Sequence, residues 1–419
     1  MTQIVIVYIY GPNNAGDMAL NCGAVDVLQS LGDVRIVGIS RFSEHHPGYS
    51  ATVRYMRSAY SSVGMLPFPV DYDRHSQSLI RQAIGFLKGS LLFFPSIDCP
   101  LTGDNAVLKA IRSADYVVFN GGNLLFSRSL KDNLRLRGIL YPIACAKAFD
   151  KPYGFLPQSI PDLANRAGRE TIESFLREAR FCFFRESVSS RTVELGGSSQ
   201  CVFPDLAFFI QRTDHEAAMS ILASSKLRIG EFVPVVLRAS SLGDQNELPD
   251  RDRRETTELV GDLFLKLRAM GLQPVLVVQT LQDKRISEAS ARQGRYLGVE
   301  VPIIEELNPL VLRGIYQRAY CTIAFRLHAA ILSLSAGTPA IGIYRTAWGS
   351  KMPGTFDDLG LRRLCFDFRD LRHNQLLDID ELIAFSRKAL MDVAKRIDHE
   401  RLRMRECLAN AMNLQNLSP

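Results

Sequence analysis

The sequence of 419 residues lacks the long apolar runs and the paired metal-ligating residues that mark several classes of protein. No uninterrupted apolar stretch of about 18 residues occurs, which argues against a membrane-spanning helix. The eight cysteines form no CxxC motif and the seven histidines show no ligand spacing, so we expect no metal site. Most cysteines stand in apolar runs, which is typical of reduced core residues in a cytoplasmic protein.

The chain also lacks a large net charge. The 50 Lys and Arg residues exceed the 44 Asp and Glu residues by a formal charge of +6, which allows an anionic substrate. The basic residues are dispersed and no stacking-aromatic motif accompanies them, so we expect no nucleic-acid partner. The apolar N-terminal segment has neither a charged region nor a small-residue cleavage site, and it predicts a first strand rather than a signal peptide.

Short apolar runs alternate with helix-period segments along most of the chain. This alternation predicts parallel sheets covered by helices on both faces. A polar stretch at 210–230 separates two such series, so we predict an α/β protein with two Rossmann-like domains that face a cleft. The first domain covers 1–209 and contains a poorly assigned insertion at 41–100. The second covers 231–375, and an amphipathic helical segment follows at 376–419.

The most apolar part of the insertion is the segment 79–97, which is interrupted by Arg81 and Lys88. Two interpretations are open. The segment is either a buried or lid-like element, or an interfacial helix on a membrane surface. We favour the first, because a membrane-surface helix normally shows a broader basic face.

Ligands of open α/β sheets bind beyond the carboxyl ends of the strands, so the residues that follow each apolar run are candidates for a site. Arg185, Arg238 and Arg326 stand at three such ends. One arginine there is compatible with an ordinary ion pair. Three arginines directed into one cleft favour a site for an anion.

A glycine-containing turn follows the first predicted strand and contains Asn13, Asn14, Gly16 and Asp17. It is not a P-loop, because no Gly-Lys-Ser/Thr follows. Asp17 alone is best interpreted as an N-cap of the next helix. The functional alternative is that Asn13 and Asp17 hold sugar hydroxyls.

A second turn contains Gly121, Gly122 and Asn123. It is either a plain tight turn or a place where the backbone closely approaches a ligand.

The triplet Arg326-Leu327-His328 lies between a predicted strand and a helix of small residues. The arginine fork can grip a phosphate or a carboxylate with two N–H groups. His328 falls at a helix N-terminus, where the dipole favours a neutral imidazole that can act as a base. The alternative is a histidine bonded to a backbone carbonyl. The amides of the same helix N-terminus add a second feature that suits an anion.

Taken together, these motifs resemble those of the polysaccharide pyruvyltransferase family. Along the chain they are an NxGD motif, a Gly-Gly turn, a glutamine after a strand, an Arg-Glu-Ser triplet, the Arg-Leu-His triplet and a Gly-x-Pro strand that ends in tyrosine. Each motif is short, but their order and spacing are specific, and the match is poorest at 41–100. The residues that carry it are Asn14, Ala15, Gly16, Asp17, Gly121, Gly122, Gln158, Arg185, Glu186, Ser187, Arg326, Leu327, His328, Gly337, Thr338, Pro339 and Tyr344.

The resemblance implies a GT-B-like fold and transfer of a pyruvyl group from phosphoenolpyruvate to a hexose of an exopolysaccharide or cell-surface glycan, which gives a pyruvate ketal. It implies no cofactor. By position, Arg326 and His328 correspond to the family's catalytic pair and Arg185 to its other essential arginine. The first domain is then the acceptor side and the second the donor side. The expected substrate-binding residues are Asn13, Asn14, Gly16, Asp17, Gly121, Gly122, Asn123, Gln158, Ser187, Arg238, Tyr344, Arg345 and Lys351.

Two departures from the family pattern concern this set. The family often has three glycines where this chain has Gly121, Gly122 and Asn123. It often has Tyr-x-x-Lys, whereas here Arg345 follows the tyrosine and the next lysine is Lys351. Whether Arg345 or Lys351 takes the role of the family lysine stays open.

The expected acceptor is a glycan or a lipid-linked saccharide, and the expected location is the cytoplasm. A lipid-linked acceptor would place the protein at the inner face of the membrane, in peripheral contact through 79–97 and the C-terminal basic helix. The alternative function is a nucleotide-sugar-dependent glycosyltransferase of GT-B fold. Against it, no acidic residue stands between Arg326 and Asp357, where paired glutamates would hold a ribose. The sequence indicates no oligomeric state.

Overall fold

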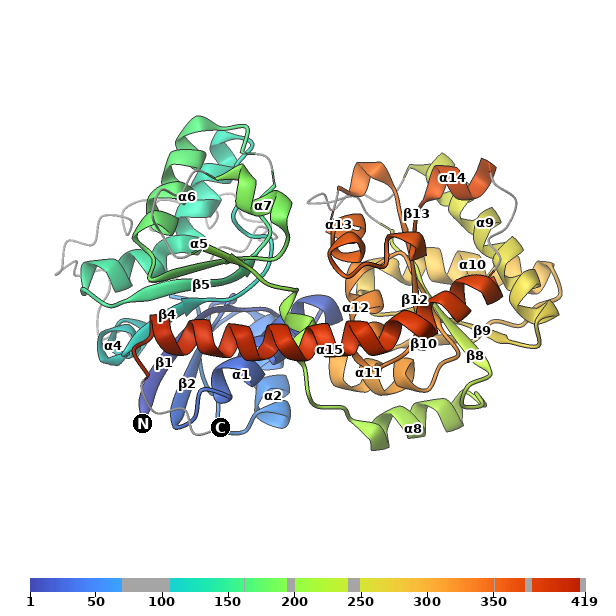
Figure 1. The fold of residues 1–419 in the computed structure, drawn as a ribbon, viewed down its shortest axis with the longest axis horizontal. Helices are drawn as coiled ribbons and strands as arrows, with labels where there is room; N and C mark the ends of the chain where they lie inside the picture. The colour runs from blue at the N-terminus through green and yellow to red at the C-terminus, as the bar shows by residue number, and fades with distance from the viewer. Residues whose placement is uncertain are drawn as a thin grey trace. The chain divides into compact units, whose positions relative to one another are not determined.

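A computed structural model of the chain is shown in Figure 1. It describes residues 1–69, 106–161, 163–193, 200–239, 249–349, 351–373 and 379–414, and the segment 79–97 lies outside this set. The chain folds into two units. Unit 1 comprises Met1–Pro12, Leu20–Leu206 and Glu400–Pro419, and unit 2 comprises Asn13–Ala19 and Ala207–His399.

Unit 1 is built on a seven-stranded parallel sheet in the order β3-β2-β1-β4-β5-β6-β7. All four residues of β6 are buried, as expected of a strand covered by helices on both faces. The strands are β1 (Thr2–Ile9), β2 (Val34–Ser40), β3 (Gly64–Leu66), β4 (Tyr116–Phe119), β5 (Tyr153–Gln158), β6 (Phe181–Phe184) and β7 (Gln200–Val202). The helices are α1 (Ala15–Gln29), whose first residues belong to unit 2, α2 (Pro47–Ala59), α4 (Ala106–Ser113), α5 (Leu130–Ala148), α6 (Arg166–Glu178) and α7 (Ser187–Thr192).

Unit 2 is built on a six-stranded parallel sheet in the order β10-β9-β8-β11-β12-β13. Its strands are β8 (Phe232–Val236), β9 (Gln273–Val278), β10 (Ile303–Glu305), β11 (Thr322–Ala324), β12 (Ala340–Tyr344) and β13 (Cys365–Asp367). Its helices are α8 (His215–Ser224), α9 (Asp250–Ala269), α10 (Lys284–Tyr296), α11 (Pro309–Gln317), α12 (Leu327–Ser335), α13 (Lys351–Asp358) and α14 (Phe368–His373), with α15 (Ile379–Ala411) contributing to both units. Short 3₁₀ turns are η2 (Leu206–Phe209), η3 (Leu281–Asp283), η4 (Thr346–Trp348) and η5 (Arg362–Leu364).

The strand order of each sheet is that of a doubly wound Rossmann fold. The order reverses between β1 and β4 in unit 1 and between β8 and β11 in unit 2. The predicted class, an α/β fold with two parallel-sheet Rossmann-like parts, is therefore confirmed. Ligands of such sheets bind at the point of reversal, beyond the carboxyl ends of the strands, so the residues after β8 and β11 are the first to examine.

The start of α1 differs from expectation. The helix begins at Ala15, and the side-chain Oδ1 of Asn14 accepts the backbone N–H of Gly16 at 2.9 Å. The expected N-cap role of Asp17 is therefore wrong, because Asp17 lies inside the first turn of the helix rather than before it. Asn14 takes the capping position because the helix starts earlier than its apolar periodicity indicates.

Helix α15 has 33 residues and presents the amphipathic character expected of this segment. Ile383, Val393, Ile397 and Met404 are buried, while the basic residues at 387, 388, 395 and 396 are exposed. Among the described residues, no helix is both long and apolar enough to cross a membrane.

Candidate anion-binding site

Two arginines follow the two strands between which the strand order of unit 2 reverses. Arg238 follows β8 and Arg326 follows β11, each with one residue between it and the strand. The two guanidinium groups lie close enough to repel each other electrostatically. The structure therefore brings together two of the sequence-predicted residues at the carboxyl edge of this sheet.

A buried carboxylate, that of Asp283, binds Arg326 and attracts Arg238. Asp283, the last residue of η3, is 1% exposed. It accepts hydrogen bonds from Nε of Arg326 and, at 2.7 Å, from Nη2 of the same guanidinium. Asp283 offsets the repulsion between the two guanidinium groups only in part, which suits an anionic ligand.

The surroundings of Arg238 reinforce this charge imbalance. Burial and repulsion from Arg326, opposed only in part by Asp283, lower the pKa of Arg238 to about 10. Its guanidinium carbon lies 4.8 Å from the ring centroid of Trp348, which is buried and is the only tryptophan of the chain. An anion held beside Arg238 and Arg326 would relieve their repulsion.

His328 lies in the first turn of α12, and its ring packs against Gly16 in the first turn of α1. A Cβ atom added to Gly16 would lie 2.2 Å from Nδ1 and 2.7 Å from Cγ of His328. The imidazole therefore occupies the space that any larger residue at position 16 would need. The NxGD motif and the Arg-Leu-His triplet, which are far apart in the sequence, meet in unit 2 through this contact.

Asn14 fixes the loop before α1 to the end of β9. Besides the N–H of Gly16, its Oδ1 accepts the hydroxyl of Thr280 at 3.2 Å. The backbone N–H of Ala15 donates to the carbonyl of Gln279 at 2.9 Å. The side-chain oxygen of Asn14 thus positions Gly16 beneath His328, whereas Asn13 is exposed and Asp17 is half-buried.

We expect Gly16→Ala to lower kcat by about 10–100-fold, because the new methyl group displaces the imidazole of His328. The collision also costs stability, but alanine favours a helix over glycine by about 1 kcal/mol, so the fall in stability should be small beside the fall in kcat. Gly354→Ala is the matched control, because this helical glycine in α13 has no atom within 4 Å of the added Cβ position. Steady-state kinetics and thermal melting measure both effects, and equal losses in the two variants would contradict the explanation.

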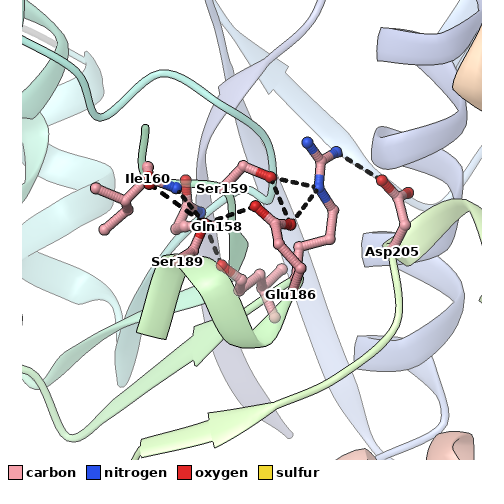
Figure 2. Close-up of polar contacts among 8 residues, drawn as sticks. Gln158, Ser159, Ile160, Glu186, Ser189 and Asp205 are labelled. Atoms are coloured by element: carbon pink, nitrogen blue, oxygen red, sulfur yellow. Dashed lines mark hydrogen bonds and ion pairs between the residues drawn. The ribbon is translucent and has the colours of Figure 1, made fainter. Parts of the chain in front are cut away.

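A second cluster of polar side chains surrounds the predicted residue Arg185, which directly follows β6 in unit 1 (Figure 2). Its side chain is 4% exposed, and it donates from Nη1 to Asp205 at 2.6 Å and from Nε to the hydroxyl of Ser159 at 2.8 Å. Glu186 lies 3.6 Å from the same Nε and accepts the hydroxyls of Ser159 and Ser189. Burial disfavours the charged guanidinium, but Asp205 and Glu186 outweigh it and raise the pKa of Arg185.

The Gly-Gly turn after β4 is held by hydrogen bonds from Tyr10 and Gln158. Tyr10 donates from its hydroxyl to the carbonyl of Gly121 at 3.0 Å. A Cβ atom on Gly122, whose φ is +148°, would lie 2.0 Å from the same hydroxyl oxygen. Gln158 donates from Nε2 to the carbonyl of Asn120 at 2.8 Å. Gly122 therefore permits the approach of Tyr10 to the turn.

Arg345 is held against neighbouring helices of unit 2. Its Nη2 donates to the carbonyl of Asp252 at 3.2 Å and to the hydroxyl of Thr256 at 3.1 Å, both on α9. Its guanidinium carbon lies 3.7 Å from the ring centroid of Phe368 on α14. The other predicted residues lie at element ends: Tyr344 at the end of β12, Lys351 at the start of α13, Ser187 at the start of α7 and Asn123 after the Gly-Gly turn.

Sequence reasoning missed Asp283 and Trp348. Asp283 stands in a run of polar and charged residues that is typical of a solvated helix start. The available signal was its position after β9, at the same sheet edge as the arginines. Trp348 belongs to no motif. Among the described residues, no group of three or more His, Cys, Asp or Glu side chains could hold a metal ion.

A model of the polysaccharide pyruvyl transferase family matches residues 14–346 of the chain. The amylovoran biosynthesis protein AmsJ of Erwinia amylovora is 22% identical over 271 residues, which are 62% of this chain and 64% of AmsJ. The chain thus spans just under two thirds of the length of this curated relative.

Solved structures of low sequence identity share the fold. UDP-GlcNAc 2-epimerase from Neisseria meningitidis, bound to UDP-GlcNAc, has a TM-score of 0.54 and 11% identity, with 96% of this chain and 100% of that chain covered. Phytolacca americana UGT2, complexed with UDP-2-fluoro-glucose and pterostilbene, has a TM-score of 0.56 and 11% identity, with 99% and 100% covered. At these identities the likeness bears on the fold alone, and it confirms the GT-B-like architecture.

Proposed function

Since the chain belongs to the polysaccharide pyruvyl transferase family, we propose that it transfers a pyruvyl group from phosphoenolpyruvate to a hexose of an exopolysaccharide or cell-surface glycan. The product is a ketal that joins the pyruvyl carbon to two sugar hydroxyls. The family match supports a pyruvyl transferase, and the relative AmsJ supports polysaccharide biosynthesis. The donor, the ketal and a cytoplasmic reaction on a free or lipid-linked glycan are parts of the proposal.

The arginine pair of unit 2 is the observation that carries the proposal. Phosphoenolpyruvate bears a carboxylate and a phosphate on one small frame, and each charge-assisted hydrogen bond to it contributes about 1.5–3 kcal/mol. Asp283 is bound to Arg326, and Arg326 repels Arg238 more strongly than Asp283 attracts it, which favours an anion beside the pair. The N-terminus of α12 lies beside them and favours the same anionic groups.

The cluster around Arg185 has the opposite balance. Among the described ion pairs, the guanidinium of Arg185 meets two carboxylates, those of Asp205 and Glu186, so these three groups together carry a net negative charge. Such a cluster would repel a phosphate. We therefore assign donor binding to unit 2 and acceptor binding to unit 1, and we assign Arg185 to shaping the acceptor side.

The proposed reaction begins when an acid protonates the methylene carbon of phosphoenolpyruvate, which makes C2 electrophilic. A hexose hydroxyl adds to C2 and loses its proton. The bond from C2 to the phosphate oxygen then breaks, and phosphate leaves with the electron pair. A second hydroxyl then adds to C2, loses its proton to the solvent or the released phosphate, and closes the ketal. His328 exchanges a proton with the attacking hydroxyl or the departing phosphate. Arg238 and Arg326 stabilise the charge on that phosphate.

Other predicted residues complete the proposal. Because its contacts hold Arg345 against α9, we assign the role of the family lysine to Lys351. Asn13 and Asp17 flank the turn that supports His328 and are our candidates for contacts with the sugar hydroxyls.

Titration of the purified protein with phosphoenolpyruvate tests the proposal without an acceptor. We expect a Kd below about 1 mM and a change in the fluorescence of Trp348, because an anion at Arg238 alters the charge stacked on its ring. Calorimetry should show at least a ~10-fold weaker Kd for Arg326→Ala. Arg251→Ala, which removes an exposed arginine paired with Glu255, should leave the Kd unchanged.

Parallel titrations with UDP-hexoses and GDP-mannose provide the contrary outcome. Binding of a nucleotide sugar, with none of phosphoenolpyruvate, would replace pyruvyl transfer by glycosyl transfer.

A further inference from the structure

Asp283 is bound to Arg326 along one edge of the guanidinium group. The contacts use Nε and Nη2, which form the side edge of the arginine fork. The opposite, terminal edge consists of Nη1 and the second N–H of Nη2, and Nη1 donates to none of the described residues. The aspartate therefore orients the guanidinium without occupying the edge that can grip a carboxylate or phosphate.

The same carboxylate also fixes the loop that carries Arg238. Its Oδ1 accepts the backbone N–H of Ala239, the residue after Arg238, at 2.8 Å. The backbone N–H of Asp283 donates to the carbonyl of Thr280 at 2.9 Å, which holds η3 against the end of β9. One side chain thus joins the carboxyl ends of β8, β9 and β11, which are adjacent in the sheet.

We propose that Asp283 is a positioning residue for donor binding, which holds the terminal edge of the Arg326 guanidinium toward the donor and fixes the loop of Arg238 beside it. This inference rests on the proposed function, in which the two arginines bind phosphoenolpyruvate. Asp283 is 1% exposed and paired on both oxygens, so it acts through these arginines rather than on the donor itself.

A double-mutant cycle in the full-length protein tests this assignment. The variants are Asp283→Asn, Arg326→Ala and their combination, with Kd for phosphoenolpyruvate measured by calorimetry. Each single variant should raise Kd by about 10–100-fold. The combination should be no more than about threefold weaker than Arg326→Ala alone, because residues that act as one unit are not additive.

Kinetics separate positioning from general damage to the structure. Asp283→Asn should raise KM for phosphoenolpyruvate with little change in kcat, whereas a partly unfolded enzyme loses kcat at constant KM. Glu305→Gln is the matched control. It makes the same change in net charge in unit 2. It breaks an exposed ion pair, in which Nζ of Lys284 lies 2.7 Å from the Glu305 carboxylate. We expect its KM to be unchanged.

Three results would overturn the proposal. They are wild-type affinity in Asp283→Asn, fully additive losses in the cycle, and a fall in kcat at constant KM. If Asp283→Asn does not fold, Asp283→Glu keeps the charge and displaces the carboxylate, and it should raise KM. Equality with wild type would then overturn the assignment. A wild-type protein that binds no phosphoenolpyruvate would overturn the proposed function itself, which is a different result from unaltered binding by the aspartate variant.

Discussion

Replacement of His328 by alanine should lower kcat by about 10²–10⁴-fold and leave the Kd for phosphoenolpyruvate nearly unchanged. The ring of His328 lies against the backbone of Gly16, in a turn that Asn14 fixes to the end of β9. A side chain supported in this way is oriented in advance, which is what proton transfer to a sugar hydroxyl or a phosphate requires. The arginines that we assign to the donor remain in place in this variant.

The cause of the loss can be verified with His328→Gln, which retains hydrogen-bonding atoms but has no group that exchanges a proton near neutral pH. It should be as slow as His328→Ala. In the His328→Ala background, Gly16→Ala should have no further effect on kcat, because the imidazole with which its methyl group collides is absent. A fully active His328→Ala enzyme would exclude the histidine from the chemistry.

The sequence predicts the fold well because most strands of both sheets are buried on two faces. Such strands appear as continuous apolar runs, as in the Phe-Cys-Phe-Phe of β6. The insertion at 41–100 resisted assignment for the opposite reason. Its edge strand β3 has three residues, none of them buried, and therefore gives neither a continuous apolar run nor a clear alternation.

The candidate site is predictable only in part. The strand-end rule finds Arg185, Arg238 and Arg326, since it depends on position along the chain. It cannot give the charge balance around each arginine, because that depends on which carboxylates the fold brings near. Arg185 contacts two carboxylates, whereas Arg326 contacts one, which also attracts Arg238. In the sequence, all three arginines are identified by the same feature, which is their position after a strand. The sequence also cannot show why position 16 is a glycine, because the space for a side chain there is filled by the ring of His328, which is far away in the sequence.

Replacement of Arg185 by methionine should reduce the free energy of unfolding by about 3–5 kcal/mol, which is the cost of leaving buried charges without their partner. Asp205 is fully buried and Glu186 is nearly so, and both would lose the guanidinium that they share. Arg166→Met is the matched control. It breaks a 2.8 Å pair with Glu170 in which both side chains are exposed, and it should cost no more than about 1 kcal/mol.

Chemical denaturation measures both losses, and similar values for the two variants would show that the buried network adds little. Arg185→Lys then separates structure from function, because it keeps the charge and loses the fork. If Arg185 only shapes unit 1, this variant should lose stability yet bind phosphoenolpyruvate with the wild-type Kd. A large rise in Kd in the folded variant would instead place Arg185 on the donor. In that case the arrangement of two carboxylates around Arg185 would have to change before phosphoenolpyruvate binds, because two carboxylates around one guanidinium repel a phosphate.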